Sequence, residues 1–525
     1  MKGRQPAVKP GKAGSPIIPG LGADLPALQK ARALWQANRF DESVELFEQT
    51  AQRYPQNAVA LIDAARALGA RFEIGRAEPF LERLMVLAKG RPDLLHLVGQ
   101  TYRMIFRPEL AQRCFEQVVA RTRDIPDAAL ELAVLLERRH QVTEAFAQIE
   151  DCLRHDPTYA EAQLFRARLL RRLKRGEESL SAFRKMAHDN SLHPAVRAQA
   201  WTEVAQELDR REEYRPAMLA LLQAKELLRQ REGPLLREAE SVLQHLVTLN
   251  ESLTADHYQR WQQEGSEQPS ARTAVLTSFP RSGTTLLEQV LDSHSDVVSS
   301  DEREAFARDI FPSLWLGSGL PYPTAAALDS CPPAERARLR QRYSRFMEAA
   351  LNEPLAGRLH LDKNPPMTLV LPGFLRLFPE VRVLFALRDP RDVVISCFFQ
   401  SLPLNPNSVC FLTLERTCRR YAEDLRVWRI LRERMVSPWL EVRYEDTVAD
   451  LEREARRALG FLGLPWEESV LGYRERLRTR AVGSPSYEAV SQPLYTKAIG
   501  RWKHYQEFLE PCLPILEPAV QTFQY

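Results

Sequence analysis

Residues 274–294 read AVLTSFPRSGTTLLEQVLDSH, and this stretch decides the fold of the second half of the chain. Residues 274–277 form a short apolar run typical of a strand, and an apolar segment with helical spacing begins at Leu286. A strand, a turn and a helix in this order place the backbone N–H groups of residues 282–285 at the first turn of a helix. There they can cradle an anion with the help of the helix dipole.

The turn combines a glycine with side chains that donate hydrogen bonds. Gly283 lacks the side chain that would block the close approach of an anion, and the donors are Arg281, Ser282, Thr284 and Thr285. The nucleoside-triphosphatase pattern GxxxxGK[ST] is absent, because no Lys follows the glycine. This departure disfavours a kinase or nucleoside triphosphatase, which we keep as a third hypothesis that turnover of ATP with Mg²⁺ would revive.

A second segment repeats the same construction. Residues 381–387, VRVLFAL, form a nearly continuous apolar run of the kind found in buried parallel strands, and the helical VVISCFFQ follows the turn RDPRD. Arg388 is thereby predicted at the carboxyl end of a strand and Ser396 on the next helix. A salt-bridged turn would explain Arg388 and Asp389 alone, but it explains less well why one domain contains the construction twice.

The string PRSGTTLL after a strand resembles the loop with which sulfotransferases hold the 5′-phosphosulfate of 3′-phosphoadenylyl sulfate (PAPS). That family uses an Arg and a Ser at the separation of Arg388 and Ser396 to hold the 3′-phosphate. Tyr444, within VRYED, matches a family Tyr that approaches the adenosine, although it could equally be a core residue. Ser486 and Arg501 match phosphate-contacting positions of a late loop that closes over the co-substrate.

This resemblance covers roughly residues 272–510 and implies an α/β, P-loop-like domain with a mostly parallel sheet. It is closest to the tyrosylprotein sulfotransferase branch, because PRSGTTLLEQVLDSHSDVVSSDE matches the loop, helix and acidic pair of that branch. The co-substrate site that it implies consists of Arg281, Ser282, Gly283, Thr284, Thr285, Arg388, Ser396, Tyr444, Ser486 and Arg501.

Sulfuryl transfer needs in-line positioning, cations near the sulfuryl group and the leaving oxygen, and a base for the acceptor hydroxyl. The resemblance assigns Arg281 to the sulfuryl oxygens and Lys363, in LDKNP, to the bridging oxygen. A surface Lys that caps a turn is the structural alternative for Lys363. Glu302 is the expected base if burial raises its pKa, with Asp301 and His294 as alternatives.

Recognition of the acceptor stays open at the sequence level. The tyrosylprotein branch carries an Arg two residues beyond its catalytic acid, whereas Glu304 has that position here. A peptide or protein tyrosine is the acceptor that the resemblance implies, and a carbohydrate, a lipid or a small phenol remains an alternative.

A period of 34 residues runs through the first half of the chain. Small residues recur in one series and large apolar residues in another, so that small residues let antiparallel helices approach and the bulky residue fills the gap to the next unit. This period and pattern resemble the tetratricopeptide repeat, with an irregular helical domain as the alternative. The two series are Ala31, Ala65, Gly99, Ala133, Ala167 and Phe47, Leu81, Phe115, Ile149, Phe183.

The composition narrows the possible functions further. With 72 Lys+Arg against 69 Asp+Glu, a net charge of +3 argues against a strongly basic nucleic-acid binder. No apolar run approaches the roughly 20 residues that span a bilayer, and the first residues lack the apolar core of a secretory signal. The seven Cys form no CxxC pair, so we expect reduced thiols and no metal site. We therefore expect a cytoplasmic protein without nucleic-acid or membrane partners.

These observations predict a multidomain protein that consists of an all-α tetratricopeptide-repeat solenoid followed by the α/β domain. The expected parts are a flexible tail (1–24), an array of about six repeats (25–226), a helical linker (227–270) and the sulfotransferase domain (271–525). The expected activity is transfer of a sulfuryl group from PAPS to a hydroxyl, with a protein or peptide acceptor bound in the groove of the repeats. The alternative is a repeat-based scaffold whose second domain binds nucleotide without reacting. The oligomeric state stays open.

Overall fold

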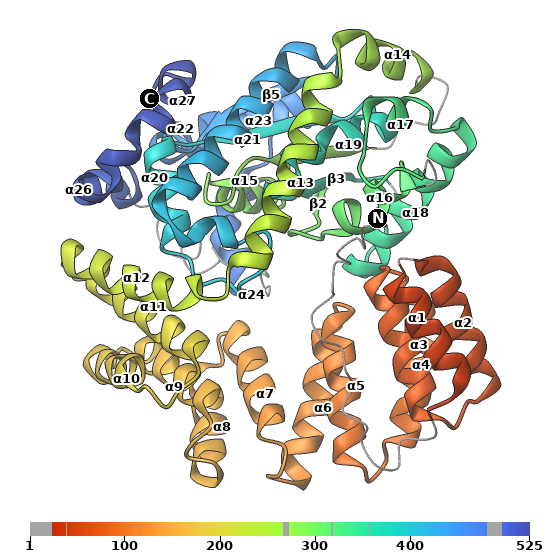
Figure 1. Ribbon diagram of the computed structural model, residues 1–525, viewed down its shortest axis with the longest axis vertical. Coiled ribbons are helices and arrows are strands. Elements are labelled where there is room, and N and C mark those ends of the chain that lie inside the picture. Colours follow the sequence, from red (N-terminus) through yellow and green to blue (C-terminus); the bar gives the residue numbers. More distant parts are fainter. Residues whose placement is uncertain (1–23, 38, 266–271, 317–318, 356, 480–495) are drawn as a thin grey trace, which may run out of the picture. The chain divides into compact units, whose positions relative to one another are not determined.

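The computed structural model describes residues 24–37, 39–265, 272–316, 319–355, 357–479 and 496–525 (Figure 1). The chain forms two compact units. The first takes in the described residues of Met1–Glu137 together with Thr143–Tyr159 and Glu348–Glu353, and the second takes in Arg138–Val142, Ala160–Met347 and Pro354–Tyr525.

Paired helices build the first unit, as the period of 34 predicts. Ala31, Ala65 and Ala133 are fully buried between helices. Gly99 shows why these positions are small, since an added Cβ would lie 2.7 Å from the ring of Phe115. The helices are α1 (Pro26–Gln36), α2 (Phe40–Arg53), α3 (Ala58–Ala70), α4 (Ile74–Leu87), α5 (Pro92–Met104), α6 (Pro108–Arg121), α7 (Pro126–Arg138) and α8 (Val142–His155).

The same helical pattern continues at the start of the second unit. Ser179 Oγ donates to the carbonyl of Ala167 at 2.7 Å, and Ser43 Oγ makes the equivalent bond to Ala31 in the first unit. This recurrence confirms the predicted repeat fold. The helices are α9 (Ala160–Arg172), α10 (Gly176–His188), α11 (Pro194–Arg210), α12 (Tyr214–Arg229), α13 (Gly233–Ser252) and α14 (Ala255–Gly265).

A five-stranded sheet with the order β2-β3-β1-β4-β5 forms the centre of the α/β region, and every strand pair in it is parallel. This confirms the predicted α/β fold with a parallel sheet. Because the strands are parallel, their carboxyl ends meet at one edge, where ligands bind in open α/β sheets. The strands are β1 (Thr273–Thr277), β2 (Val297–Ser299), β3 (Leu359–Lys363), β4 (Arg382–Leu387) and β5 (Trp439–Arg443).

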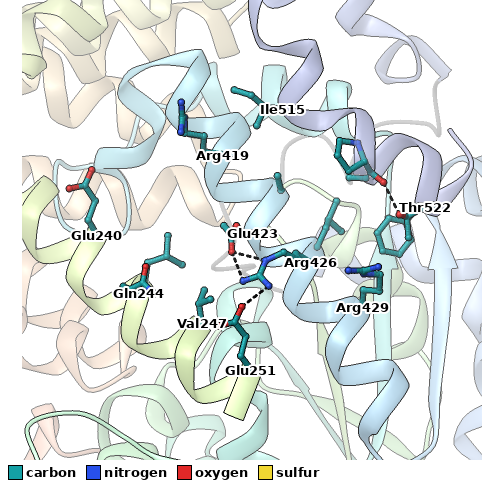
Figure 2. A pocket seen from close by; sticks show the side chains of 16 residues that line it. Glu240, Gln244, Val247, Glu251, Arg419, Glu423, Arg426, Arg429, Ile515 and Thr522 are labelled. Atoms are coloured by element: carbon teal, nitrogen blue, oxygen red, sulfur yellow. Dashed lines mark hydrogen bonds and ion pairs between the residues drawn. The ribbon is translucent and has the colours of Figure 1, made fainter. Parts of the chain in front are cut away.

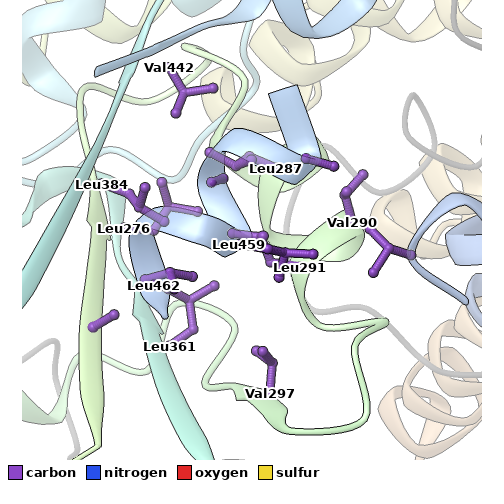
Figure 3. Close-up of a cluster of buried hydrophobic side chains, with 14 of the residues drawn as sticks. Leu276, Leu287, Val290, Leu291, Val297, Leu361, Leu384, Val442, Leu459 and Leu462 are labelled. Carbon is purple, nitrogen blue, oxygen red and sulfur yellow. The ribbon is translucent and has the colours of Figure 1, made fainter. Parts of the chain in front are cut away.

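A buried apolar cluster fixes the helix that follows the first loop against the sheet (Figure 3). Leu276, Leu361 and Leu384 contribute from three neighbouring strands, and they meet side chains of α15 (Thr284–Leu291) and α23 (Leu451–Leu462). The packing holds the first turn of α15 at the carboxyl end of β1.

The remaining helical elements all follow β2 in the chain. Among the described residues, no helix is both long and apolar enough to cross a membrane. The elements are η1 (Phe306–Ile310), α16 (Phe311–Ser313), α17 (Ala325–Asp329), α18 (Pro333–Leu351), η3 (Pro365–Val370), α19 (Leu371–Leu377), α20 (Pro390–Phe398), η4 (Val409–Leu412), α21 (Leu414–Arg434), α22 (Tyr444–Ala449), η5 (Glu468–Gly472), α24 (Tyr473–Thr479), η6 (Thr496–Ala498), η7 (Arg501–Tyr505), α26 (Gln506–Leu509), η8 (Glu510–Cys512) and α27 (Leu513–Phe523).

Candidate functional site

The loop between β1 and α15 has the geometry of an anion cradle. Gly283 immediately precedes the helix with a φ of 96°, in the left-handed region that glycine adopts without strain. Arg281 also has a positive φ, of 74°. Ser282, Thr284 and Thr285 are buried at the first turn of α15, where backbone N–H groups have no acceptor within the helix.

Tyr444 covers this loop from the carboxyl end of β5. A Cβ added to Gly283 would lie 2.7 Å from a ring carbon of Tyr444, so the glycine is required by space as well as by backbone conformation. The Arg388 guanidinium lies 4.8 Å from the centre of the same ring. The ring of Tyr444 therefore lies against the loop and beside Arg388, and its contact with adenosine stays a prediction.

The two predicted strand–loop–helix segments meet here. Arg281 Nε donates to Ser396 Oγ at 3.0 Å, and Arg388 Nη1 donates to the carbonyl of Arg281 at 3.1 Å. Arg388 is only 6% exposed, and its Nε has no hydrogen-bond partner among the described residues. A buried guanidinium with one N–H group left over, beside a helix N-terminus, fits a bound phosphate or sulfate group.

Arg501 is placed close to this cluster but is engaged elsewhere. Its Nη2 lies 2.9 Å from Asp209 Oδ2 of α11, and its guanidinium lies 4.5 Å from the centre of the Phe399 ring. The turn that carries Arg501 is anchored by Asp392, whose carboxylate accepts from the backbone N–H groups of Gly500 and Trp502 at 2.7 and 2.8 Å. The predicted contact residue Ser486 lies outside the described residues.

A second cluster surrounds Lys363 at the end of β3. Its Nζ lies 2.7 Å from Glu302 Oε1, 3.0 Å from Glu288 Oε2 and 3.6 Å from Asp301 Oδ1. The Lys363 side chain is fully buried, so the structural alternative of a surface lysine is wrong. Asp301 and Glu302 follow the end of β2, and Lys363 is the last residue of β3. Glu288 lies in the middle of α15.

The acidic pair after β2 has an unusual backbone. Asp301 and Glu302 have φ values of 41° and 60°, in a region that side chains other than glycine rarely adopt. The Glu302 N–H donates to the carbonyl of Lys363 at 2.9 Å, which holds the turn against β3. The Glu302 side chain is 33% exposed and that of Asp301 is 18% exposed, so Glu302 is the more open to an incoming hydroxyl.

His294, the third candidate base, has both ring nitrogens engaged. Its Nε2 lies 3.0 Å from the carbonyl of Pro465, and its Nδ1 accepts from the N–H of Asp296 at 3.0 Å. The side chain is fully buried at the end of α15. These two hydrogen bonds tie the loop between α15 and β2 to the segment before η5.

Burial shifts the pKa of several groups in the Lys363 cluster. Burial raises the pKa of Glu288 to about 8, although the Lys363 charge opposes this. Burial alone would lower the pKa of Lys363, but attraction by Glu288, Glu302 and Asp301 outweighs it and raises that pKa. Lys363 is therefore a cation across the neutral pH range.

Sequence reasoning missed Glu288, Asp392 and Asp209. The signal for Glu288 was present, since it is a charged residue within the apolar run LLEQVL, and the neighbouring side chains are buried. Asp209 and Asp392 carried no comparable signal, because acids on repeat helices and in Asp-Pro turns are common at surfaces. Among the described residues, no group of three or more His, Cys, Asp or Glu is arranged to hold a metal ion.

A groove of about 760 Å³ lies elsewhere, between α13, α21 and α27 (Figure 2). Arg426 crosses it with ion pairs to Glu251 at 2.8 Å and Glu423 at 3.0 Å. None of the predicted site residues that the structure describes lines this groove.

Comparisons with known proteins match both parts of the chain. The sequence model described as "Sulfotransferase family" matches residues 274–468, and the one described as "Tetratricopeptide repeat" matches residues 28–84 and 107–159. The predicted combination of tetratricopeptide repeats with a sulfotransferase-family domain is thus confirmed.

Curated relatives include protein-tyrosine sulfotransferases. The chain is 24% identical over 359 residues to an "Uncharacterized protein" of Aquifex aeolicus, covering 67% of this chain and 45% of the relative. It is 25% identical to "Protein-tyrosine sulfotransferase 1" of Danio rerio, covering 43% of this chain and 64% of the relative. For "Protein-tyrosine sulfotransferase" of Drosophila melanogaster the identity is 26%, with 50% and 52% covered. The chain thus spans about half of the length of these relatives.

Two solved structures that are similar to this chain have low TM-scores. The sulfotransferase domain from the Synechococcus PCC 7002 olefin synthase is 20% identical with a TM-score of 0.32, covering 45% of this chain and 89% of that one. Retinol dehydratase in a complex with retinol and PAP is 16% identical with a TM-score of 0.29, covering 50% and 85%.

Proposed function

We propose that this chain, which joins tetratricopeptide repeats to a sulfotransferase-family domain, is a sulfotransferase that uses PAPS and a hydroxyl acceptor. The observation that carries the proposal is the meeting of two sets of residues at one edge of the sheet. One set is the Gly283 loop with Arg281, Arg388 and Ser396, and the other is Lys363 with Glu302. The first set fits an anionic nucleotide and the second pairs a cation with a carboxylate base.

In this proposal the first set holds and orients the co-substrate. The first turn of α15, with Ser282, Thr284 and Thr285, holds the 5′-phosphosulfate, and Arg281 neutralises charge on the sulfuryl oxygens. Arg388 and Ser396 hold the 3′-phosphate, and Tyr444 lies against the adenosine. Arg501 and Ser486 add contacts from the late loop.

The second set handles the proton and the leaving group. Glu302 accepts the proton of the acceptor hydroxyl while the hydroxyl oxygen bonds to sulfur and the bond from sulfur to the phosphate oxygen breaks. Lys363 places a fixed positive charge where negative charge develops on the leaving oxygen. When bound, PAPS supplies the sulfuryl group, and adenosine 3′,5′-bisphosphate is the product.

A protein or peptide tyrosine is the acceptor that we propose, presented by the repeats. The protein-tyrosine sulfotransferases among the relatives support this acceptor class, and paired helices of the repeat type commonly bind extended peptides. A carbohydrate, a lipid and a small phenol are the competing acceptors. We propose a cytoplasmic location together with this function.

The test is transfer from radiolabelled PAPS to acceptor mixtures by the full chain. Tyrosine peptides, oligosaccharides and phenols are offered separately, and product is counted for wild type and for Arg281→Ala. The proposal expects label on one acceptor class and none with the variant. The matched control is Arg338→Ala on α18, because that side chain is 54% exposed and pairs with Glu335 three residues away in the same helix.

The second candidate is a scaffold whose α/β domain binds nucleotide without reacting. The Asp209–Arg501 ion pair favours it, since a repeat helix and the co-substrate region are joined directly. Binding of adenosine 3′,5′-bisphosphate by wild type without transfer to any acceptor class would support this candidate, and absence of binding would overturn both.

A further inference from the structure

Lys363 is bound by more carboxylates than the proposed reaction uses. Glu302 is the proposed base and Asp301 its alternative, yet Glu288 also lies 3.0 Å from the Lys363 ammonium. Glu288 and Lys363 are both fully buried. Nothing in the proposed reaction so far accounts for this third carboxylate.

The position of Glu288 is costly unless its charge has a use. It lies on α15 among Leu286, Leu287, Val290 and Leu291, which are all buried. A leucine at this position would avoid the cost of taking a carboxylate out of water. The charge is tolerated because Lys363 compensates it.

The two oxygens of Glu288 face different partners. Ser299 Oγ, at the end of β2, donates to Oε1, and Oε2 faces Lys363 at the end of β3. The carboxylate therefore joins the helix that carries the anion loop to the two strand ends that carry the base and the cation. It fixes the ammonium relative to the first turn of α15.

We propose that Glu288 is a positioning residue that holds the Lys363 ammonium and shares its charge, which leaves Glu302 free to turn to the acceptor and take its proton. This inference rests on the proposed function. A buried ammonium with Glu302 as its main partner would hold that carboxylate tightly and make it a poor base. A second, fixed carboxylate weakens this hold and keeps the ammonium in place when Glu302 leaves it.

The electrostatics of the cluster agree with this geometry. The charged groups that interact directly with Glu288 are Lys363 and Asp301, and Glu302 shares Lys363 with it. Burial raises the pKa of Glu288, and the attraction of its carboxylate is the largest of the effects that raise the pKa of Lys363.

A purely structural role is the competing explanation. In that case Glu288 only ties α15 to β2 through Ser299. Its loss would then lower stability without altering the proton transfer at Glu302.

The deciding variant is Glu288→Gln, which keeps the shape and an acceptor for Ser299 Oγ but replaces the carboxylate oxygen that faces Lys363 with an uncharged amide group. We expect kcat to fall about 10- to 100-fold with the KM for PAPS nearly unchanged. We also expect the loss of kcat to grow as the pH rises through about 8, because Glu288 is ionised there in wild type and shares the Lys363 ammonium, whereas the amide cannot. Ser299→Ala is the matched control, since it removes the uncharged partner of the same carboxylate and should not show this dependence on pH.

Two further measurements keep the test independent of folding and of activity. Glu288→Asp retains the charge and should recover part of kcat, so it replaces Glu288→Gln if that variant does not fold. In nucleotide-free protein, the chemical shift of Lys363 Nζ in lysine-selective ¹⁵N NMR should change as the pH rises through about 8 in wild type, where the neighbouring Glu288 ionises, and should not do so in Glu288→Gln.

The outcomes separate the two levels of the proposal. A loss of kcat that does not grow with pH, together with a Lys363 signal that does not respond to pH near 8 in wild type, would overturn the role of Glu288 even if wild type transfers sulfate. If wild type transfers no sulfate, the proposed function fails, while the Lys363 titration still decides whether Glu288 holds the ammonium.

Discussion

Arg501 Nη2 lies 2.9 Å from Asp209 Oδ2, so a cation predicted to contact the nucleotide is ion-paired to helix α11. The pair is about four-fifths buried on both sides, since the side chains are 20% and 19% exposed. Tyr505 donates a short hydrogen bond to the same carboxylate. A phosphate that binds Arg501 has to compete with Asp209.

Asp209→Asn should therefore raise the affinity for adenosine 3′,5′-bisphosphate. The variant weakens the ion pair that competes with the nucleotide for Arg501. We expect the Kd to fall about 3- to 10-fold, because one partly buried competing charge is lost. Isothermal titration calorimetry measures this. Glu212→Gln is the control, because its contact with Lys497 at 3.3 Å is exposed and should leave the Kd unchanged. Weaker binding by Asp209→Asn would mean that Arg501 needs Asp209 for its position.

Gly283→Ala should damage both folding and nucleotide binding. The backbone at Gly283 is left-handed, and the new Cβ would lie 2.7 Å from Tyr444. We expect a loss of about 1–3 kcal/mol in the free energy of unfolding and weaker binding of adenosine 3′,5′-bisphosphate. Chemical denaturation and calorimetry measure the two effects. In Gly460→Ala on α23 the added Cβ meets nothing within 4 Å, so that variant should be neutral or stabilising.

Lys363→Met should destabilise the protein in a pH-dependent way. It leaves buried carboxylates without their cation, which costs about 3–5 kcal/mol. Burial raises the pKa of Glu288 in the folded protein to about 8, above its value in the unfolded chain. The stability that results from this shift is present at acid pH and is lost as the pH rises through about 8. The difference in Tm between wild type and variant should therefore be larger on the alkaline side than on the acid side.

Thermal unfolding over a pH series checks this expectation. Lys497→Met is the control, because that side chain is 79% exposed. A Tm difference that shrinks as pH rises would contradict the assignment of Lys363 as the counter-charge of the cluster.

Glu302→Gln should separate catalysis from binding. Loss of a general base lowers kcat about 10²- to 10⁴-fold, whereas the affinity for adenosine 3′,5′-bisphosphate should hold, since Glu302 is proposed to contact the acceptor. Sulfate transfer and calorimetry provide the two readouts. Asp301→Asn tests the rival carboxylate, and a larger loss of kcat in that variant would move the base to Asp301.

The local features of the fold could be predicted from the sequence because they depend on spacing alone. The period of 34 puts Gly99 against Phe115, and the segment around Gly283 specifies a strand, a turn and a helix within about twenty residues. Parallel strands then bring Arg388 and Ser396 to the same edge as Arg281, because their carboxyl ends must coincide.

Contacts between distant segments were decided only by the tertiary structure. The ion pairs of Lys363 with Glu288 and of Arg501 with Asp209 join different elements, and no local periodicity encodes which charges will face each other. Nor does the string LDKNP say whether its lysine is exposed or buried, since that depends on what packs over the end of β3. The sequence alone therefore determined which residue types reach the edge of the sheet. Three-dimensional packing decided which of them share a charge, because electrostatic interactions depend on distance and burial rather than on order along the chain.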